Sequence, residues 1–303
     1  MIKILISILL AVYSTVSASA QLIEYTVHHA PGGVSDRITR LISKELPSSE
    51  YLVQNRPGGS GRIAVNHILK GDSVLIATVP QIFVTNPLSF TDLEYNPNID
   101  LEILGTVGII PNLLVCNSKS GIVNFSTLIN TTKSLSFATS GYGSSDHIAT
   151  ELLFTQLKGK HIIVPYGSGG NKSIIDVLGG SVDCTFGNYA TVKPIMKDER
   201  IVVLFSSHNM GDSVTTWEQY FKEPFPYQSY IALTVSRNMD PEKKKKIIQD
   251  VKNVWERKGF KESVFNLGVL PVLNTELTAT NSVLRSVREL RKFIVNNNIP
   301  LGY

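Results

Sequence analysis

The chain has 303 residues, of which 43% are hydrophobic, so it is long enough for one large domain or two of medium size. Its 29 basic and 25 acidic residues give a formal net charge of +4. This charge does not predict nucleic-acid binding, which needs a dense cluster of Lys and Arg. With 2 cysteines in all, the chain is not a disulfide-rich scaffold.

The first twenty residues have the pattern of a secretory signal peptide. Lys3 gives a positive start, residues 4–13 form an apolar run, and Ala18-Ser19-Ala20 is an A-x-A cleavage site. An uncleaved membrane anchor is the less favoured alternative, because the run is far shorter than the ~20 residues that span a bilayer. We therefore expect a periplasmic protein that begins at Gln21, which is not a cysteine and so carries no lipid anchor.

Strand-like and helix-like stretches alternate along the rest of the chain. Residues 22–29 and 51–55 are typical of strands, and each leads through a Gly-rich turn into a helical pattern. Residues 73–79 continue the alternation, which restarts at 134–140 with another strand, turn and helix. Such alternation predicts an α/β protein with parallel sheets covered by helices on both faces.

Two long apolar runs, near residues 105–116 and 227–236, separate the repeated units. We interpret them as two crossing strands between two doubly wound lobes. Lobe I is then residues 21–110 together with 230–303, and lobe II is residues 111–229. Ligands in open α/β sheets bind beyond the carboxyl ends of the strands, so we expect a cleft there between the lobes.

Two helices are expected after the second long run. The first begins at Asp240-Pro241-Glu242, and its basic run Lys243–Lys246 is interpreted as a solvated face. The positions expected to be buried are Ile247, Ile248, Val251 and Trp255 in this helix, and Val283, Val287, Leu290 and Ile294 in the last one.

A Gly-x-Ser-Asp-x-Ile phrase occurs twice, about 110 residues apart, each time between a strand-like run and a helical pattern. The two copies are Gly33, Ser35, Asp36 and Ile38, and Gly143, Ser145, Asp146 and Ile148. We interpret Ser35 and Ser145 as N-caps, with an aspartate in each first turn. The start of a helix attracts anions, and glycine lets a ligand approach the backbone closely. The two turns are therefore predicted to form the two sides of an anion-binding cleft. Helix capping alone is the alternative for the Ser-Asp pairs.

Two further Gly-rich turns, residues 55–62 and 165–173, are expected near the same cleft. The second is similar to a phosphate-binding loop but has Asn171 where a glycine should precede Lys172, so we expect no nucleotide site.

Catalytic and metal-binding patterns are absent from the sequence. No G-x-S-x-G motif occurs, and His147 beside Ser144 and Ser145 is expected to make local contacts rather than to activate a nucleophile. His28 and His29 follow a strand but have no cluster of carboxylates or cysteines around them, and contact with the protein is favoured over contact with a ligand. We expect no enzyme activity, no cofactor and no metal.

The two cysteines, Cys116 and Cys184, both lie in apolar strand-like runs. Buried free thiols are the favoured interpretation, and a disulfide is the alternative if the two strands are neighbours.

The glycine turns and their surroundings resemble the Bug family, the substrate-binding proteins of tripartite tricarboxylate transporters. The resemblance covers nearly the whole mature chain in the family's order. It rests on the stretches APGGVSDRITRLI, VQNRPGGSGRIA, FATSGYGSSDHIATELL, VPYGSGGNKSIIDVLGGSVD and ELRKFIVNNNIP.

This resemblance implies a type II periplasmic-binding-protein fold, with two lobes on a hinge of two crossing strands. It also implies that backbone N–H groups, hydroxyls and waters of the first two turns hold a ligand carboxylate. The ligand-binding residues carried over are Pro31, Gly32, Gly33, Val34, Ser35, Asp36, Ser140, Gly141, Gly143, Ser144, Ser145 and His147.

Three positions depart from the family's pattern. Val34 replaces a small polar residue or glycine, His28-His29 replaces an aromatic or proline pair, and Val79-Pro80-Gln81 replaces a polar turn. The far end of the ligand is therefore expected to differ from that of familiar di- and tricarboxylates.

The resemblance implies a monomeric solute-binding protein that delivers a small carboxylate to a membrane permease, with no nucleic acid as partner. A periplasmic sensor that signals to a membrane kinase or another partner is the alternative. An enzyme acting on a carboxylate is disfavoured, because no general base is paired with a nucleophile.

Overall fold

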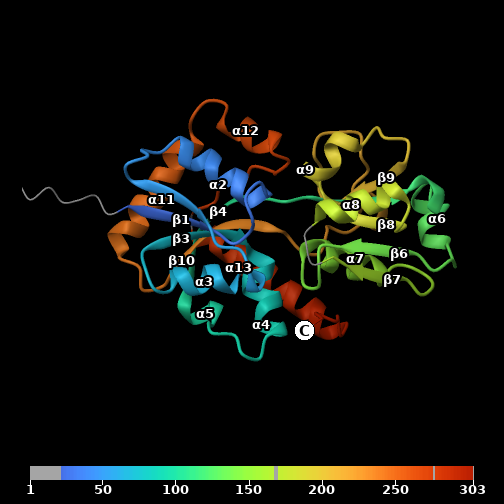
Figure 1. Cartoon of the computed structure of the whole chain (residues 1–303), viewed down its shortest axis with the longest axis horizontal. Helices are drawn as coiled ribbons and strands as arrows, with labels where there is room; N and C mark the ends of the chain where they lie inside the picture. Colours follow the sequence, from blue (N-terminus) through green and yellow to red (C-terminus); the bar gives the residue numbers. More distant parts are fainter. Residues whose placement is uncertain (1–21, 167–169, 276, 303) are drawn as a thin grey trace, which may run out of the picture.

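The computed structural model describes residues 22–166, 170–275 and 277–302. It contains two five-stranded sheets, ordered β2-β1-β3-β10-β4 and β7-β6-β8-β5-β9. Figure 1 shows the two sheets in separate lobes, with the blue amino-terminal strands and the orange strand β10 in lobe I and with lobe II beside it. The two-lobed α/β fold expected from the sequence is confirmed.

Lobe I contains the first sheet. Its strands are β1 (Ile23–Val27), β2 (Tyr51–Asn55), β3 (Ser73–Thr78), β4 (Leu101–Ile109) and β10 (Tyr230–Ser236). Its helices are α2 (Val34–Lys44), α3 (Arg62–Ile68), α4 (Asn86–Ser89), α5 (Pro97–Asp100), α11 (Pro241–Trp255), α12 (Phe260–Asn266) and α13 (Leu277–Asn296), with a 3-10 turn η1 (Gly59–Gly61) and a π-helix η2 (Gln81–Thr85). Strands β1, β2 and β3 are parallel, so their carboxyl ends lie at one edge.

Lobe II contains the second sheet. Its strands are β5 (Asn112–Asn117), β6 (Ser136–Thr139), β7 (Ile162–Pro165), β8 (Cys184–Asn188) and β9 (Ile201–Ser206). Its helices are α6 (Phe125–Asn130), α7 (Ser145–Phe154), α8 (Gly170–Gly179), α9 (Tyr189–Val192) and α10 (Trp217–Phe221), with 3-10 turns η3 (Ser118–Ser120) and η4 (Lys193–Ile195). Strand β6 pairs in parallel with both β7 and β8.

The expectation of parallel sheets holds only for part of each sheet, because both sheets are mixed. Strand β10 pairs antiparallel with both β3 and β4, and β5 pairs antiparallel with both β8 and β9. The physical reason is the crossing of the chain between lobes, which brings a strand into each sheet from the opposite direction. Alternation of strands and helices does not reveal such a reversal, because a buried strand has the same apolar pattern in either direction.

The first long apolar run is two strands rather than one, divided at Ile110 and Pro111. Strand β4 before the break belongs to lobe I, and β5 after it belongs to lobe II. The second long run is strand β10 of lobe I, so the return crossing lies in the segment before it. The Ile110 N–H donates to the Ser229 carbonyl at 3.0 Å, which ties the two crossing segments together.

Cys116 and Cys184 form a disulfide, so the favoured interpretation of free thiols is wrong. The two residues lie directly opposite each other on the neighbouring antiparallel strands β5 and β8, with their Cα atoms 4.0 Å apart. This adjacency, which the sequence leaves open, is the condition that a disulfide requires.

The C-terminal helices bury the face that the sequence predicts. Helix α11 buries Ile247, Val251 and Trp255, and α13 buries Val283, Leu290 and Ile294, whereas Ile248 and Val287 are only partly buried. The basic run of α11 forms ion pairs with carboxylates of Asp72, Glu102, Glu242, Glu50 and Asp250. None of the helices in the described part of the chain is long and apolar enough to span a membrane.

Candidate functional site

The first glycine turn connects strand β1 to helix α2. The helix begins at Val34, and its N-cap is Gly33, which has no side chain to cap the first turn. Ser35 is therefore not the N-cap that the sequence suggests; it lies inside the first turn and is buried. The first N–H groups of a helix have no intrahelical acceptor, so those of Val34 and Ser35 are available to a ligand.

Gly33 is not required by the backbone conformation. Its φ of −67° and ψ of 166° are ordinary extended values. A Cβ atom placed on it would come no closer than 3.5 Å to the Ala30 carbonyl oxygen, which is an ordinary contact. A serine or aspartate at this position would accept a hydrogen bond from a backbone N–H of the first turn. With glycine there, the helix loses this capping hydrogen bond and its first N–H groups have no side-chain acceptor.

Asp36 folds back on the turn. Its Oδ2 atom accepts hydrogen bonds from the Gly32 N–H at 2.9 Å and the Arg40 Nε at 3.1 Å, and its Oδ1 accepts from Asn55 Nδ2 at 2.9 Å. Burial alone would raise the pKa of Asp36, but the bonds from Gly32, Arg40 and Asn55 together hold it below its ordinary value. The carboxylate therefore fixes the shape of the turn, and the Gly32 N–H already has an acceptor in it.

The second glycine turn connects strand β6 to helix α7. The helix begins at Ser145, and the N-cap is Ser144, whose side chain accepts from the His147 N–H at 3.3 Å. The expectation that Ser145 is the N-cap is wrong by one residue. The Tyr227 hydroxyl, on the segment that returns to lobe I, donates to the Ser145 carbonyl.

Asp146 has the same role in the second turn as Asp36 in the first. Its Oδ2 atom accepts from the Ser140 N–H at 2.6 Å and from the Ser140 hydroxyl at 2.5 Å. Burial raises the pKa of Asp146, and the hydrogen bonds from Ser140 and Ser144 only partly oppose this. The repeated Ser-Asp phrase thus builds two similar turns, each held by its own aspartate.

His147 is buried behind this turn. Its Nδ1 atom accepts from the Gly143 N–H at 3.2 Å, so the ring proton is on Nε2. Burial lowers the pKa of His147 to about 4, which keeps the ring neutral at physiological pH. The nearest carboxylate oxygen, Oε1 of Glu151, lies 3.7 Å from Nε2, too far for a hydrogen bond. The local contacts that the sequence suggests for this residue are present.

The two lobes meet at the second turn. A Cβ atom on Gly143 would lie 3.2 Å from the Cβ atom of Thr85, the last residue of the π-helix η2 that follows β3 in lobe I. Strand β1 pairs in parallel with β3, so the first turn lies at the same edge of the sheet as η2. Sequence reasoning missed Thr85 and the π-helix; the only signal was the unusual Val79-Pro80-Gln81 segment before them.

The predicted ligand-binding residues differ in their exposure. Pro31 and Gly32 are exposed; Ser35, Asp36, Gly143 and His147 are buried; and the partly exposed ones are Gly33, Val34, Ser140, Gly141, Ser144 and Ser145.

The third glycine turn, residues 55–62, lies beside the end of β1. Its Ser60 carbonyl accepts from Asn86 Nδ2 at 2.9 Å, and a Cβ atom on Gly61 would lie 3.2 Å from Cδ2 of His28. The fourth turn falls partly outside the described residues, at 167–169. Its Lys172 bonds Asp176 at 3.1 Å and lies over the Tyr166 ring.

Three of the arginines beside the first and third turns are paired with carboxylates. Arg40 binds Asp36, Arg56 binds Glu24 through two hydrogen bonds, and Arg62 pairs with Asp92. These cations are therefore already neutralised within lobe I, and no cluster of three or more metal-ligating side chains occurs among the described residues.

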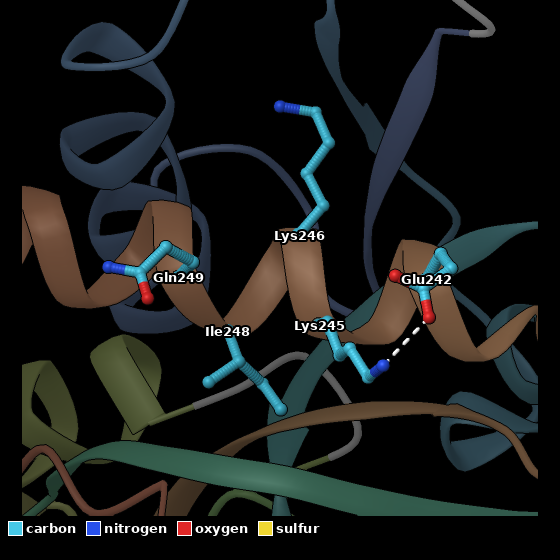
Figure 2. A pocket seen from close by; sticks show the side chains of 5 residues that line it. All are labelled: Glu242, Lys245, Lys246, Ile248 and Gln249. Carbon is cyan, nitrogen blue, oxygen red and sulfur yellow. Dashed lines mark hydrogen bonds and ion pairs between the residues drawn. The ribbon is translucent and has the colours of Figure 1, made fainter.

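A surface hollow on helix α11 is a poor candidate for the site. Figure 2 shows its lining residues, all from this one helix, with Glu242 and Lys245 joined at 2.7 Å. Lys246 is bound to Glu50 and Asp250 at 2.8 Å each. Figure 1 places α11 on the side of lobe I away from lobe II, so the hollow is separate from the glycine turns.

A known family matches most of the chain. Residues 37–297 match the family described as the tripartite tricarboxylate transporter family receptor, TctC. The chain belongs to this family. The resemblance noted in the sequence is thereby confirmed, and the family is one of binding proteins rather than enzymes.

Two curated relatives are UPF0065 proteins. One, from Pseudomonas sp., is 26% identical over 193 residues, and the other, from Bordetella bronchiseptica, is 27% identical over 190 residues. Each match covers 60% of this chain and 56% of the relative, so the alignment spans just over half of the curated proteins.

Solved structures of TctC-type proteins share the fold. An R. palustris protein solved with adipate has a TM-score of 0.81 at 22% identity, covering 95% of this chain and 99% of its own. MatC from Rhodopseudomonas palustris with bound malate has a TM-score of 0.75 at 18% identity, covering 90% and 99%. The periplasmic binding protein BugD has a TM-score of 0.76 at 16% identity, covering 92% and 98%.

Proposed function

We propose that this TctC-family protein is a periplasmic solute-binding protein that holds a small carboxylate ligand between its lobes and delivers it to a tripartite tricarboxylate-type permease. It acts as a monomer, without a cofactor, a metal or enzyme activity. The adipate and malate bound to the two R. palustris structures support a carboxylate as the ligand class.

The observation that carries the proposal is the open start of helix α2. Gly33 leaves the first turn uncapped, although neither its backbone conformation nor its neighbours require glycine. Two backbone N–H groups at the positive end of an eleven-residue helix are thus left for an anion. A ligand carboxylate there replaces the missing cap.

The ligand contacts divide between the two turns. In the first, we assign the donors to the Val34 and Ser35 N–H groups, because Asp36 occupies that of Gly32. In the second, we assign them to the start of α7, at Ser144 and Ser145. Asp36, Asp146 and His147 support the turns from behind. Pro31, Gly32, Ser140, Gly141 and Gly143 shape the path of the backbone.

The lobes close on the ligand about the crossing segments. The lobe boundaries that we propose, 21–110 with 230–303 and 111–229, keep each sheet within one lobe and place the Ile110–Ser229 hydrogen bond at the hinge. Export depends on the signal pattern of residues 1–20, which lie outside the described residues.

Calorimetric titration of the purified mature protein tests the carboxylate seat. Adipate, malate and their dimethyl esters form matched probes, since only the acids carry the charge. We expect an acid to bind and its ester not to bind. Gly33→Ala should reduce the affinity for the acid by at least about tenfold, because the new methyl group lies where the ligand approaches the backbone.

Gly71→Ala is the control, since a Cβ atom there meets nothing within 4 Å. Equal binding of acids and esters, or normal binding by Gly33→Ala, would overturn the proposed seat. Delivery is tested by measuring uptake of the acid into membrane vesicles that contain a tripartite tricarboxylate-type permease, with and without the binding protein.

A further inference from the structure

The last described residues of the chain lie against the second glycine turn. A Cβ atom on Gly302 would lie 2.1 Å from Cδ2, 2.2 Å from Cγ and 2.7 Å from Cβ of Tyr142. Real Cβ atoms do not approach other heavy atoms so closely, so only a residue without a side chain fits against this ring. The φ of Gly302 is +71°, a left-handed conformation that also favours glycine. The backbone at the end of the chain therefore packs directly on Tyr142.

Helix α13, which leads into this segment, is anchored in lobe I. It packs against strand β4 and the π-helix η2. Its Ser286 hydroxyl accepts a hydrogen bond from the Gln228 N–H at 3.2 Å, in the segment that returns to lobe I. Figure 1 shows α13, in red, running from the lobe I sheet toward lobe II. Because Tyr142 belongs to lobe II, its contact with Gly302 is a contact between the two lobes.

The segment leaves α13 in a fixed direction. Asn298 has a φ of +50°, the left-handed conformation that commonly ends a helix, and the Ile299 N–H donates back to the Ile294 carbonyl at 3.0 Å. The Ile299 side chain is buried, and Leu301 packs against the same hydrophobic cluster. Residues 299–302, which we call the C-terminal strap, are therefore held by the end of α13 and move with that helix.

Tyr142 connects the strap to the second glycine turn. It lies between Gly141 and Gly143, and its ring packs edge-on against the His147 ring, with the centroids 5.2 Å apart. His147 in turn accepts a hydrogen bond from the Gly143 N–H at 3.2 Å. Loss of the strap from Tyr142 would therefore free the ring that packs on His147, and with it one support of the turn.

We propose that the C-terminal strap is a latch that holds the lobes closed on a bound ligand, with Tyr142 as the positioning residue on which it docks. The inference rests on the proposed carboxylate seat. Opening of the lobes separates Gly302 from Tyr142, and a ligand that holds the second turn in place favours the docked strap. By linkage, the docked strap favours the bound ligand to the same extent. It acts on release, because a ligand leaves only when the lobes open.

Surface plasmon resonance with adipate and malate measures association and release separately. Gly302→Ala places a methyl group against the Tyr142 ring and should displace the strap. We expect release of the bound acid to become at least about tenfold faster, while association changes by less than about twofold. Gly211→Ala is the matched control, because its φ of +73° imposes a similar backbone cost but its Cβ atom would meet nothing within 4 Å. It should release the acid at the rate of the unmodified protein.

Substitutions of the ring test whether packing on Tyr142 is the reason. Tyr142→Ala removes the surface on which the strap docks and should speed release as Gly302→Ala does. Tyr142→Phe keeps the ring and should restore the slow release. The double substitution Tyr142→Ala with Gly302→Ala should release no faster than Tyr142→Ala alone, because both changes remove the same contact.

Hydrogen exchange without ligand tests the docking of the strap independently of binding. The amides of residues 141–148 should exchange faster in Gly302→Ala and Tyr142→Ala than in Gly211→Ala. Exchange in the strands of the lobe I sheet should be the same in all of these proteins. A general loss of stability would instead speed exchange in both lobes.

Each result decides a separate question. Release from Gly302→Ala at the rate of Gly211→Ala, or release from Tyr142→Phe as fast as from Tyr142→Ala, would overturn the latch and leave the carboxylate seat intact. If neither acid binds to the unmodified protein, the proposed function fails. Unchanged exchange at residues 141–148 in Gly302→Ala would then overturn the latch as well, whereas faster exchange there supports it. If Gly302→Ala does not fold, the comparison of Tyr142→Ala with Tyr142→Phe decides the matter.

Discussion

Thr85 of lobe I lies directly against Gly143 of lobe II, so that a Cβ atom on the glycine would come within 3.2 Å of the threonine Cβ and 3.3 Å of its Oγ1. The contact joins the π-helix of lobe I to the second glycine turn, in lobe II. The two lobes are therefore in contact at these two residues. A side chain at position 143 would therefore press on Thr85 across the contact between the lobes.

We predict that Gly143→Ala weakens ligand binding more than it weakens the fold. The added methyl group contacts Thr85 and opposes closure, so the Kd for the best acid should rise about tenfold or more by calorimetry. Gly121→Ala is the matched control. Its φ of +88° imposes a similar backbone cost to the +72° of Gly143, but a Cβ atom there meets nothing within 4 Å. Equal loss of affinity in both proteins would contradict this explanation.

A second prediction concerns Gly268, behind the cleft. A Cβ atom on Gly268, in the segment after α12, would lie 2.6 Å from the Cα and N atoms of Ala190 in α9 of lobe II. Backbone atoms cannot move aside as a flexible side chain does, so Gly268→Ala should hold the lobes apart. Small-angle scattering should then show no decrease in radius of gyration with saturating ligand, whereas the unmodified protein contracts.

Gly259→Ala provides the comparison for Gly268. It lies nearby, at the N-cap of α12 with φ +78°, and its Cβ atom would meet nothing within 4 Å. Ligand-induced contraction should therefore persist in Gly259→Ala. If Gly268→Ala also contracts normally, the contact with Ala190 does not limit closure.

A third prediction concerns pH. His147 has a pKa of about 4 in the fold, against an ordinary value of 6.5, because burial disfavours its charged form. The unfolded chain thus binds a proton that the folded chain excludes, so this stability is complete above about pH 6.5 and is lost as pH falls to 4. The shift corresponds to roughly 3 kcal/mol.

His147→Gln should flatten part of the stability curve between pH 6.5 and 4. Denaturant unfolding at several pH values measures this directly. His161→Gln is the control, because His161 is partly exposed. An unchanged slope in His147→Gln would show that its ring does not carry this pH dependence.

The fourth prediction concerns the disulfide. Cys116 and Cys184 are 68 residues apart in sequence, and closing a loop of this size stabilises the folded state by about 4 kcal/mol in the chain-entropy model. At about 2 °C per kcal/mol for a chain of this size, reductant should lower the Tm by roughly 8 °C or more. The double substitution Cys116→Ser with Cys184→Ser should melt at a lower temperature and no longer respond to reductant. A Tm that reductant leaves unchanged in the unmodified protein would contradict this prediction.

The sequence predicts the parts of this fold that depend on local patterns. The burial of Ile247 and Leu290, the strand, turn and helix order around Gly33 and Gly143, and the two lobes follow from periodicity and from a recognised family. The direction of β10 and the adjacency of Cys116 to Cys184 do not, because they depend on where the chain goes after it leaves one lobe.

At the two glycine turns, the sequence predicts the presence of a turn but not its detailed hydrogen bonding. Glycine and serine at a helix start indicate a turn, but the serine that the sequence suggests as N-cap lies one residue after the actual N-cap in α7 and two residues after it in α2. The sequence indicates the aspartates only as favourable charges in the first turn, whereas each carboxylate accepts hydrogen bonds from its own turn. Apart from the unusual Val79-Pro80-Gln81 segment, the sequence gives no sign of the π-helix, because its residues resemble those of any apolar helix.

The position of β10 in the first sheet determines the order in which the protein is completed. Strand β10 lies between β3 and β4, so these two strands have no neighbour on their shared side until residues 230–236 arrive. All five strands of lobe II, and both cysteines of its disulfide, come earlier in the chain. If the chain folds from its amino terminus, lobe II has all its strands and both cysteines while the lobe I sheet still lacks the strand that joins β4 to β3.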